Sequence, residues 1–122
     1  MRAVIDTNIL IDYLNGVPDA AVELRRYRDP IVSRISWMEV LVGAAGRDSE
    51  PAVRAFLRRF RIQELNEGVA EEALKIRIER RLRLPDAIIL ACARENGCGL
   101  VTRNTRDFNA GEAEIRVPYT LP

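Results

Sequence analysis

Short strand-like runs that alternate with helix-like segments constrain the fold of this chain more than any other feature of its sequence. Apolar or alternating runs of strand length occupy residues 3–5, 31–33, 61–65, 100–102 and 115–117. Apolar residues at helical spacing occupy the segments between them, at residues 9–15, 18–28, 37–45, 51–60, 66–83 and 86–95. This alternation predicts a parallel sheet covered by helices on both faces. At 122 residues the chain has the length of one domain, so we assign residues 1–122 to a single domain.

Acidic residues lie at the ends of these strands or at the starts of these helices. Asp6 follows the first strand, and Asp107 lies in the polar loop that follows the fourth. Glu39 and Asp86 lie in the first turns of two predicted helices. In open α/β sheets, ligands bind beside the carboxyl ends of the strands. The carboxylates therefore predict a shared acidic pocket at that edge of the sheet.

Helix capping is an alternative role for three of these carboxylates. Asp6 could cap the first helix beside Thr7. Ser36 and Glu39 form the Ser-x-x-Glu pattern of a capping box, in which Glu39 would bond back to the backbone of Ser36. Asp86 lies where the helix dipole favours a negative charge. However, the helix that Asp86 begins is apolar around its circumference and therefore buried, so we expect its carboxylate to face a cleft.

The absence of histidine restricts the chemistry that the chain can support. Without histidine, Ser-His and Cys-His nucleophilic pairs and the commonest zinc ligand are excluded. Cys92 and Cys98 are the only cysteines, too few for a zinc site, and we expect both to be reduced thiols that pack in the interior. Any catalysis must therefore use carboxylates, alone or with a hard metal ion.

Net charge and hydropathy give no sign of a membrane protein or of a strongly basic one. The net charge is +1. All basic residues except Lys75 are arginine. Arginine suits phosphate, but a genome's base composition can also favour arginine codons. No apolar run reaches the roughly 20 residues that span a bilayer. Asp6 and Asp12 interrupt the apolar core that a signal peptide would need. We therefore expect a cytoplasmic protein with no membrane association.

Segments spread over nearly the full chain match one family pattern in order and spacing. They read VIDTN at 4–8, SWMEVLVG at 36–43, LPDAII at 84–89 and LVTRNTRDF at 100–108. In these segments the chain resembles PIN-domain ribonucleases, and most closely the VapC-type toxins of toxin–antitoxin pairs. The resemblance implies a three-layer α/β/α PIN-like fold with a short parallel central sheet.

The resemblance also implies a metal site built from carboxylates. Mg²⁺ or Mn²⁺ would be held by Asp6, Glu39 and Asp86. For the fourth position we assign Asp107 as the carboxylate and Asn104 as a supporting ligand that can act through water, although many family members carry Asp where this chain has Asn104. The positions that support the metal or phosphate in the family correspond here to Thr7, Asn8 and Ser36.

The activity that the resemblance implies is hydrolysis of RNA. Carboxylates bind hard divalent ions, which lower the pKa of a bound water and neutralise charge on a phosphoryl oxygen. The resulting hydroxide would attack phosphorus in line and leave a 5′-phosphate and a 3′-hydroxyl. Either one or two metal ions could take part. Arg103 and Arg106 are our candidates for binding RNA phosphate. The implied partners are RNA, a VapB-like antitoxin docked near the acidic pocket, and a second copy in a homodimer.

A non-catalytic PIN-like module is the alternative from another functional class. Such a module would pair with a DNA-binding partner and regulate transcription, and degenerate acidic positions would favour it. This chain retains Asp6, Glu39 and Asp86, which favours the enzyme.

Overall fold

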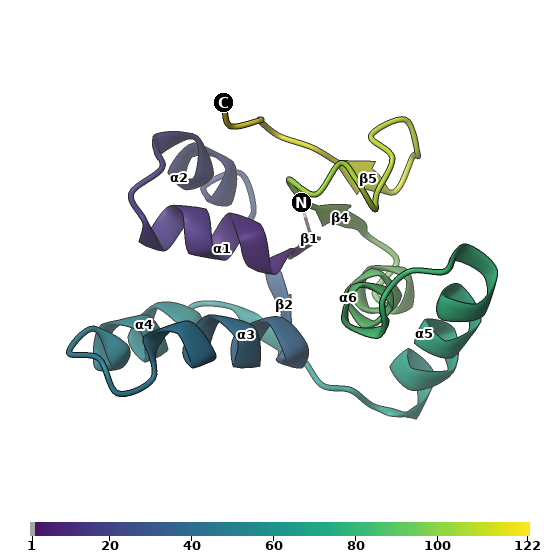
Figure 1. Cartoon of the computed structure of the whole chain (residues 1–122), viewed down its shortest axis with the longest axis horizontal. Helices are drawn as coiled ribbons and strands as arrows, with labels where there is room; N and C mark the ends of the chain where they lie inside the picture. The colour runs from purple at the N-terminus through teal and green to yellow at the C-terminus, as the bar shows by residue number, and fades with distance from the viewer. Residues whose placement is uncertain (1) are drawn as a thin grey trace.

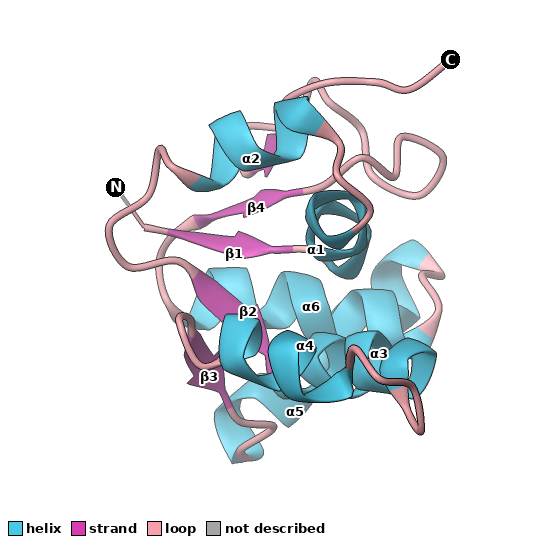
Figure 2. Cartoon of the chain, turned by 90° about the vertical axis from the view of Figure 1, so that its left-hand side faces the viewer, coloured by secondary structure: helices cyan, strands magenta, loops and turns pink. Residues whose placement is uncertain are grey.

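The centre of the fold is a parallel sheet whose strands are only two or three residues long. The computed structural model describes residues 2–122. The strands are β1 (Ala3–Ile5), β2 (Ile31–Ser33), β3 (Arg61–Gln63), β4 (Gly99–Val101) and β5 (Ile115–Arg116). They form a five-stranded sheet in the order β3-β2-β1-β4-β5, and every neighbouring pair is parallel. Figure 2 shows β4, β1, β2 and β3 in succession. The predicted parallel sheet is confirmed, and β1 occupies its centre.

Helices cover both faces of the sheet, which gives the three-layer arrangement. They are α1 (Thr7–Leu14), α2 (Pro18–Leu24), α3 (Arg34–Ala44), α4 (Glu50–Leu57), α5 (Glu67–Arg80) and α6 (Leu84–Glu95). In Figure 1, α5 and α6 lie together on one side, whereas α1 to α4 lie on the other. In the part of the chain that the structure describes, no helix is both long and apolar enough to cross a membrane.

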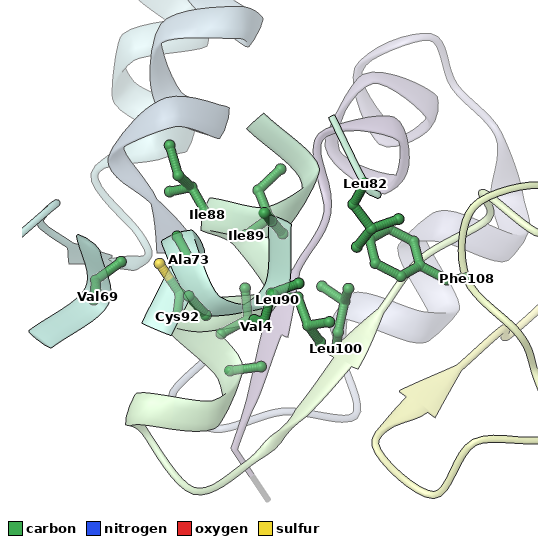
Figure 3. Packing of buried hydrophobic residues seen from close by; sticks show 14 of the residues in the cluster. Val4, Val69, Ala73, Leu82, Ile88, Ile89, Leu90, Cys92, Leu100 and Phe108 are labelled. Carbon is green, nitrogen blue, oxygen red and sulfur yellow. The ribbon is translucent and has the colours of Figure 1, made fainter. Parts of the chain in front are cut away.

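Two hydrophobic clusters hold the layers together, and alternate residues of β1, β2 and β4 enter opposite clusters. Val4 packs in the cluster formed with α5 and α6, whereas its neighbour Ile5 packs in the cluster formed with α1, α3 and α4. Figure 3 shows Val4 and Leu100 beneath α6, beside Ile89 and Leu90 of that helix. Every residue of α6 from 86 to 93 is buried, as its uniform apolar character predicted. This burial fixes the start of α6, and with it Asp86, at the edge of the sheet.

Several helix limits differ from those that the sequence predicts. Helix α3 begins at Arg34, and its N-cap is Ser33, whose side chain accepts a hydrogen bond from the Ile35 N–H. Ser36 is therefore inside the helix, and the predicted capping box of Ser36 and Glu39 is wrong. Helix α1 begins at Thr7 because Asp6 caps it. The second helix ends at residue 24 rather than about 28, and residues after it form turns.

Candidate active site

A polar groove lies at the carboxyl edge of the sheet, where β1, β2 and β4 end. Its volume is about 320 Å³, and it is lined by Asp6, Thr7, Asn8, Ile11, Glu39, Arg83, Asp86, Asn104, Arg106 and Asp107. All of the predicted carboxylates are in this lining. Residues as far apart in the chain as Asp6 and Asp107 meet here because parallel strands direct their carboxyl ends to one edge.

Asp6 is the most buried carboxylate of the groove, with 4% of its surface exposed. It caps α1 by accepting a hydrogen bond from the Thr7 N–H at 2.7 Å, and it accepts another from the Thr102 hydroxyl at 2.6 Å. Burial raises the pKa of Asp6 to about 6, because these hydrogen bonds only partly offset the loss of hydration and because Asp86 and Glu39 repel its charge. Asp6 therefore caps α1 and is also a carboxylate whose ionised form is destabilised by its surroundings. The two properties do not exclude each other.

Glu39 points back across the groove to α1. The Thr7 hydroxyl oxygen lies 2.7 Å from Glu39 Oε1 and 2.8 Å from the Ser36 hydroxyl oxygen. Because a carboxylate only accepts, the Thr7 hydroxyl donates to Glu39 and accepts from Ser36. Glu39 is therefore oriented by Thr7 at the start of α1. In a capping box it would instead accept a hydrogen bond from the backbone of Ser36.

Asp86 has a buried oxygen without a hydrogen-bond partner. Within the described chain, Asp86 Oδ2 is the buried side-chain polar atom that lacks one. The nearest cation is Arg83, whose Nε lies 3.5 Å from this oxygen and whose side chain is largely exposed. Burial raises the pKa of Asp86, and repulsion from Asp107 and Glu39 adds to the effect, while Arg83 opposes it. Buried oxygens are normally satisfied, so this one indicates a missing partner.

Asn104 and Asp107 form a compact unit in the loop after β4. The Asn104 amide donates to Asp107 Oδ2 at 3.0 Å, and the Asp107 N–H donates to Asn104 Oδ1 at 3.2 Å. The loop is held to α1 by Asn8, whose side-chain oxygen accepts a hydrogen bond from the Arg103 N–H at 3.1 Å. The Asn8 amide lies 3.4 Å from both Asp6 Oδ2 and the Thr102 hydroxyl oxygen.

The two arginines predicted to bind phosphate occupy different positions. Arg106 is exposed and lines the groove. Arg103 is not part of the groove lining, because its guanidinium forms a bidentate ion pair with Asp12, with distances of 2.7 and 2.9 Å. The structure thus gives Arg103 an internal partner and leaves Arg106 facing the groove. Arg83, which the sequence analysis did not select, lines the groove as well.

The donor set fits a hard divalent cation. Carboxylate oxygens are the ligands that Mg²⁺ prefers. The Asp86 oxygen has no hydrogen-bond partner, its charge is balanced only in part by the exposed Arg83, and the pKa of Asp6 is raised. Among residues 2–122, however, no three such side chains are drawn together into a preformed cluster. The carboxylates line the groove, and three of them would have to move closer together to share one ion.

Comparison with known families agrees with this geometry. A model of the PIN domain matches residues 3–112. The chain belongs to the PIN domain family. Comparison with curated proteins returned no match.

Solved structures of similar chains cover almost the whole molecule. A chain in a toxin–antitoxin complex from Klebsiella pneumoniae is 42% identical over 98% of this chain and 99% of that one, with a TM-score of 0.91. Chains in FitAcB from Neisseria gonorrhoeae and in DNA-bound VapBC from Salmonella typhimurium are each 23% identical, with TM-scores of 0.77. The first covers 97% of this chain and 98% of its own, and the second covers 98% of each. At 23% identity, these two similarities show that the fold is shared and nothing more.

Thr102 lies directly behind the groove of this PIN domain, and no sequence pattern gave it a role. It is fully buried, and it links Asp6 to the loop by donating to Asp6 and accepting from the Asn104 N–H at 3.0 Å. A polar residue that directly follows a buried apolar strand is the signal that could have identified it. Arg83 had a weaker signal, since it lies in a run of arginines that resembles an ordinary solvated surface.

Proposed function

We propose that this protein is a Mg²⁺- or Mn²⁺-dependent endoribonuclease that acts as the toxin of a toxin–antitoxin pair. The observation that carries the proposal is the unpartnered, buried Asp86 oxygen in a groove shared with Asp6 and Glu39. Carboxylates whose charge is balanced only in part favour a divalent cation, and PIN domains are generally nucleases. The absence of histidine agrees with hydrolysis that needs no imidazole base.

In this proposal Asp6, Glu39 and Asp86 hold the metal, and Asp107 supplies the fourth carboxylate with Asn104 beside it. When bound, the ion would lower the pKa of a water and neutralise charge on a phosphoryl oxygen. The protein's own groups orient the ligands. Thr7 fixes Glu39 at 2.7 Å, and Thr102 fixes Asp6 at 2.6 Å.

Two exposed arginines on the groove lining, Arg83 and Arg106, are the candidates for holding RNA phosphates on either side of the scissile bond. A guanidinium donates two parallel hydrogen bonds to phosphate, so each arginine can fix the substrate's orientation. In the structure, Arg83 Nε lies 3.5 Å from Asp86 Oδ2. Arg83 would be free to turn toward the substrate if Asp86 held the ion.

The partner in this proposal is an antitoxin, and the functional unit is a homodimer. The 42% identical chain comes from a toxin–antitoxin complex. A second groove, of about 410 Å³ and mainly apolar, runs between α1, α3 and α4 and shares Ile11 and Glu39 with the acidic groove. An antitoxin segment bound along this apolar groove would reach the carboxylates and could block them.

Incubation of the purified protein with mixed RNAs tests the proposal. We expect cleavage in Mg²⁺ or Mn²⁺, none in EDTA, and none with Glu39→Gln, whose exposed position should leave the fold unchanged. Co-expression with the protein encoded beside it should yield a complex that does not cleave. Cleavage that persists in EDTA, or equal cleavage by Glu39→Gln, would refute the proposed site.

A further inference from the structure

A buried carboxylate outside the groove ties three distant segments together. Asp12 lies on α1, about one helical turn after Asn8 of the groove lining, and only 4% of its surface is exposed. It accepts two hydrogen bonds from the Arg103 guanidinium, at 2.7 and 2.9 Å, and a third from the Tyr119 hydroxyl at 2.8 Å. Burial acts against the charge of Asp12, but the hydrogen bonds from Arg103 and Tyr119 outweigh it and keep its pKa lowered.

The ion pair is placed where the loop of the groove meets α1. Arg103 lies between Thr102, which donates to Asp6, and Asn104, which bonds to Asp107. Its own N–H donates to Asn8 on α1 at 3.1 Å. The side chain of Arg103 therefore anchors to α1 the same loop whose neighbouring residues reach the carboxylates.

We propose that Asp12 and Arg103 are positioning residues, which hold the loop 102–107 against α1 so that Asn104 and Asp107 stay aligned with Asp6. This inference rests on the proposed nuclease function and assigns neither residue a contact with RNA. Asp12 holds Nε and Nη2 of Arg103, which leaves Nη1 and one N–H of Nη2 as the donors that the guanidinium retains, and Arg103 does not line the groove. Mutation of residues that orient metal ligands without contacting the metal commonly lowers metal affinity or activity by about 10–100-fold.

The chain contains a matched ion pair that separates positioning from general stability. Glu23 on α2 is 3% exposed and accepts two hydrogen bonds from Arg116 on β5, at 2.7 and 2.9 Å. It accepts a third from the Tyr27 hydroxyl at 2.6 Å. The two pairs thus share burial, geometry and a tyrosine donor, but the side-chain contacts of Glu23 include no residue of the groove lining. Arg116 contacts the loop through its backbone, whose carbonyl accepts from the Thr102 N–H at 3.0 Å, and Arg116→Ala retains that bond.

The test compares Asp12→Ala and Arg103→Ala with Glu23→Ala and Arg116→Ala in the full chain, at a temperature where each is folded. We expect all four to lower the melting temperature. Only the first two should lower kcat, by about 10–100-fold, with KM for RNA little changed. Only these two should weaken Mn²⁺ binding measured by calorimetry without RNA, and speed hydrogen exchange across 102–108. The double variant should lose no more than either single one, since both act through one contact.

Three results would overturn the inference. The first is a raised KM and a flatter salt dependence for Arg103→Ala that Asp12→Ala does not share, because direct phosphate binding would produce it. The second is an equal loss of kcat in the Glu23 and Arg116 variants. The third is unchanged Mn²⁺ affinity and unchanged exchange across 102–108 in Asp12→Ala. The third result tests the positioning role even if the wild type cleaves no RNA. A wild type that cleaves no RNA would refute the proposed nuclease function but not the positioning role. If Asp12→Ala does not fold, Asp12→Asn, which retains the volume and one acceptor, replaces it in every comparison.

Discussion

Replacing Asp6 by asparagine should stabilise the metal-free protein at neutral pH, although it alters a helix cap in the core of the site. The pKa of Asp6 is raised from 3.8 to about 6, so the folded state binds a proton that the unfolded state releases between these values. The folded state therefore loses stability as pH rises through this range. Asp6→Asn carries no charge and lacks this pH-dependent loss.

The magnitude follows from the size of the shift. At about 1.4 kcal/mol per pKa unit, the ionised Asp6 destabilises the folded state by about 3 kcal/mol at neutral pH, an upper estimate. Asparagine caps a helix about as well as aspartate. However, its amide cannot accept from both Thr7 and Thr102, and one weakened hydrogen bond costs about 1 kcal/mol. The net gain should be about 1–2 kcal/mol at neutral pH, with a loss in acid.

Urea denaturation in EDTA, from about pH 4 to about pH 8, measures this effect. The free energy of unfolding of Asp6→Asn minus that of the wild type should rise by about 2.4 kcal/mol across this range, because the hydrogen-bond cost does not vary with pH and the unfolded carboxyl is already partly ionised at about pH 4. Asp48→Asn, at an exposed loop position, controls for the general effect of removing a carboxylate. A difference that stays constant with pH would refute the account of Asp6 as a buried carboxylate that lacks compensation.

Three further predictions address the metal, the substrate and the core. Mn²⁺ at a hundred times its dissociation constant should stabilise the wild type by about 2.7 kcal/mol, and Asp86→Asn much less; equal thermal shifts would exclude Asp86 as a ligand. Arg83→Ala and Arg106→Ala should each lower the slope of log affinity for RNA against log salt by about 0.7, whereas an unchanged slope would place them on an ordinary solvated surface. Leu90→Ala, in the fully buried part of α6, should lower the free energy of unfolding by about 2–5 kcal/mol in chemical denaturation, and a loss under 1 kcal/mol would contradict its role in the core.

Much of the fold is encoded in local sequence patterns. The alternation of short apolar runs with helical segments predicted the parallel sheet, and the apolar circumference of 87–93 predicted the burial of α6. Helix limits were less predictable, because they depend on which polar side chain finds a partner. Ser33 and Ser36 are equally good caps by sequence, but Ser36 is buried beside Thr7, and Ser33 therefore caps α3.

The site was predictable where chemistry follows position along a strand or helix. Asp6, Glu39, Asp86 and Asp107 were selected for lying at strand ends and helix starts, and the structure brings them to one groove. Pairings between distant residues were not predictable. Asp12 and Arg103 are 91 positions apart, and nothing local distinguishes Arg103 from Arg106. Only the fold reveals that one of them has an internal partner.

Solvent-oxygen labelling of the cleavage products is the most direct test of the central claim, that carboxylates of this groove direct a metal-activated water onto RNA phosphorus. Purified protein would cleave RNA in Mn²⁺ and water enriched in ¹⁸O, and mass spectrometry would identify the new ends. We predict 5′-phosphates that carry one solvent oxygen, 3′-hydroxyls, and no product from Glu39→Gln or from the wild type in EDTA. Ends carrying a 2′,3′-cyclic phosphate, or 5′-phosphates without solvent label, would contradict the account.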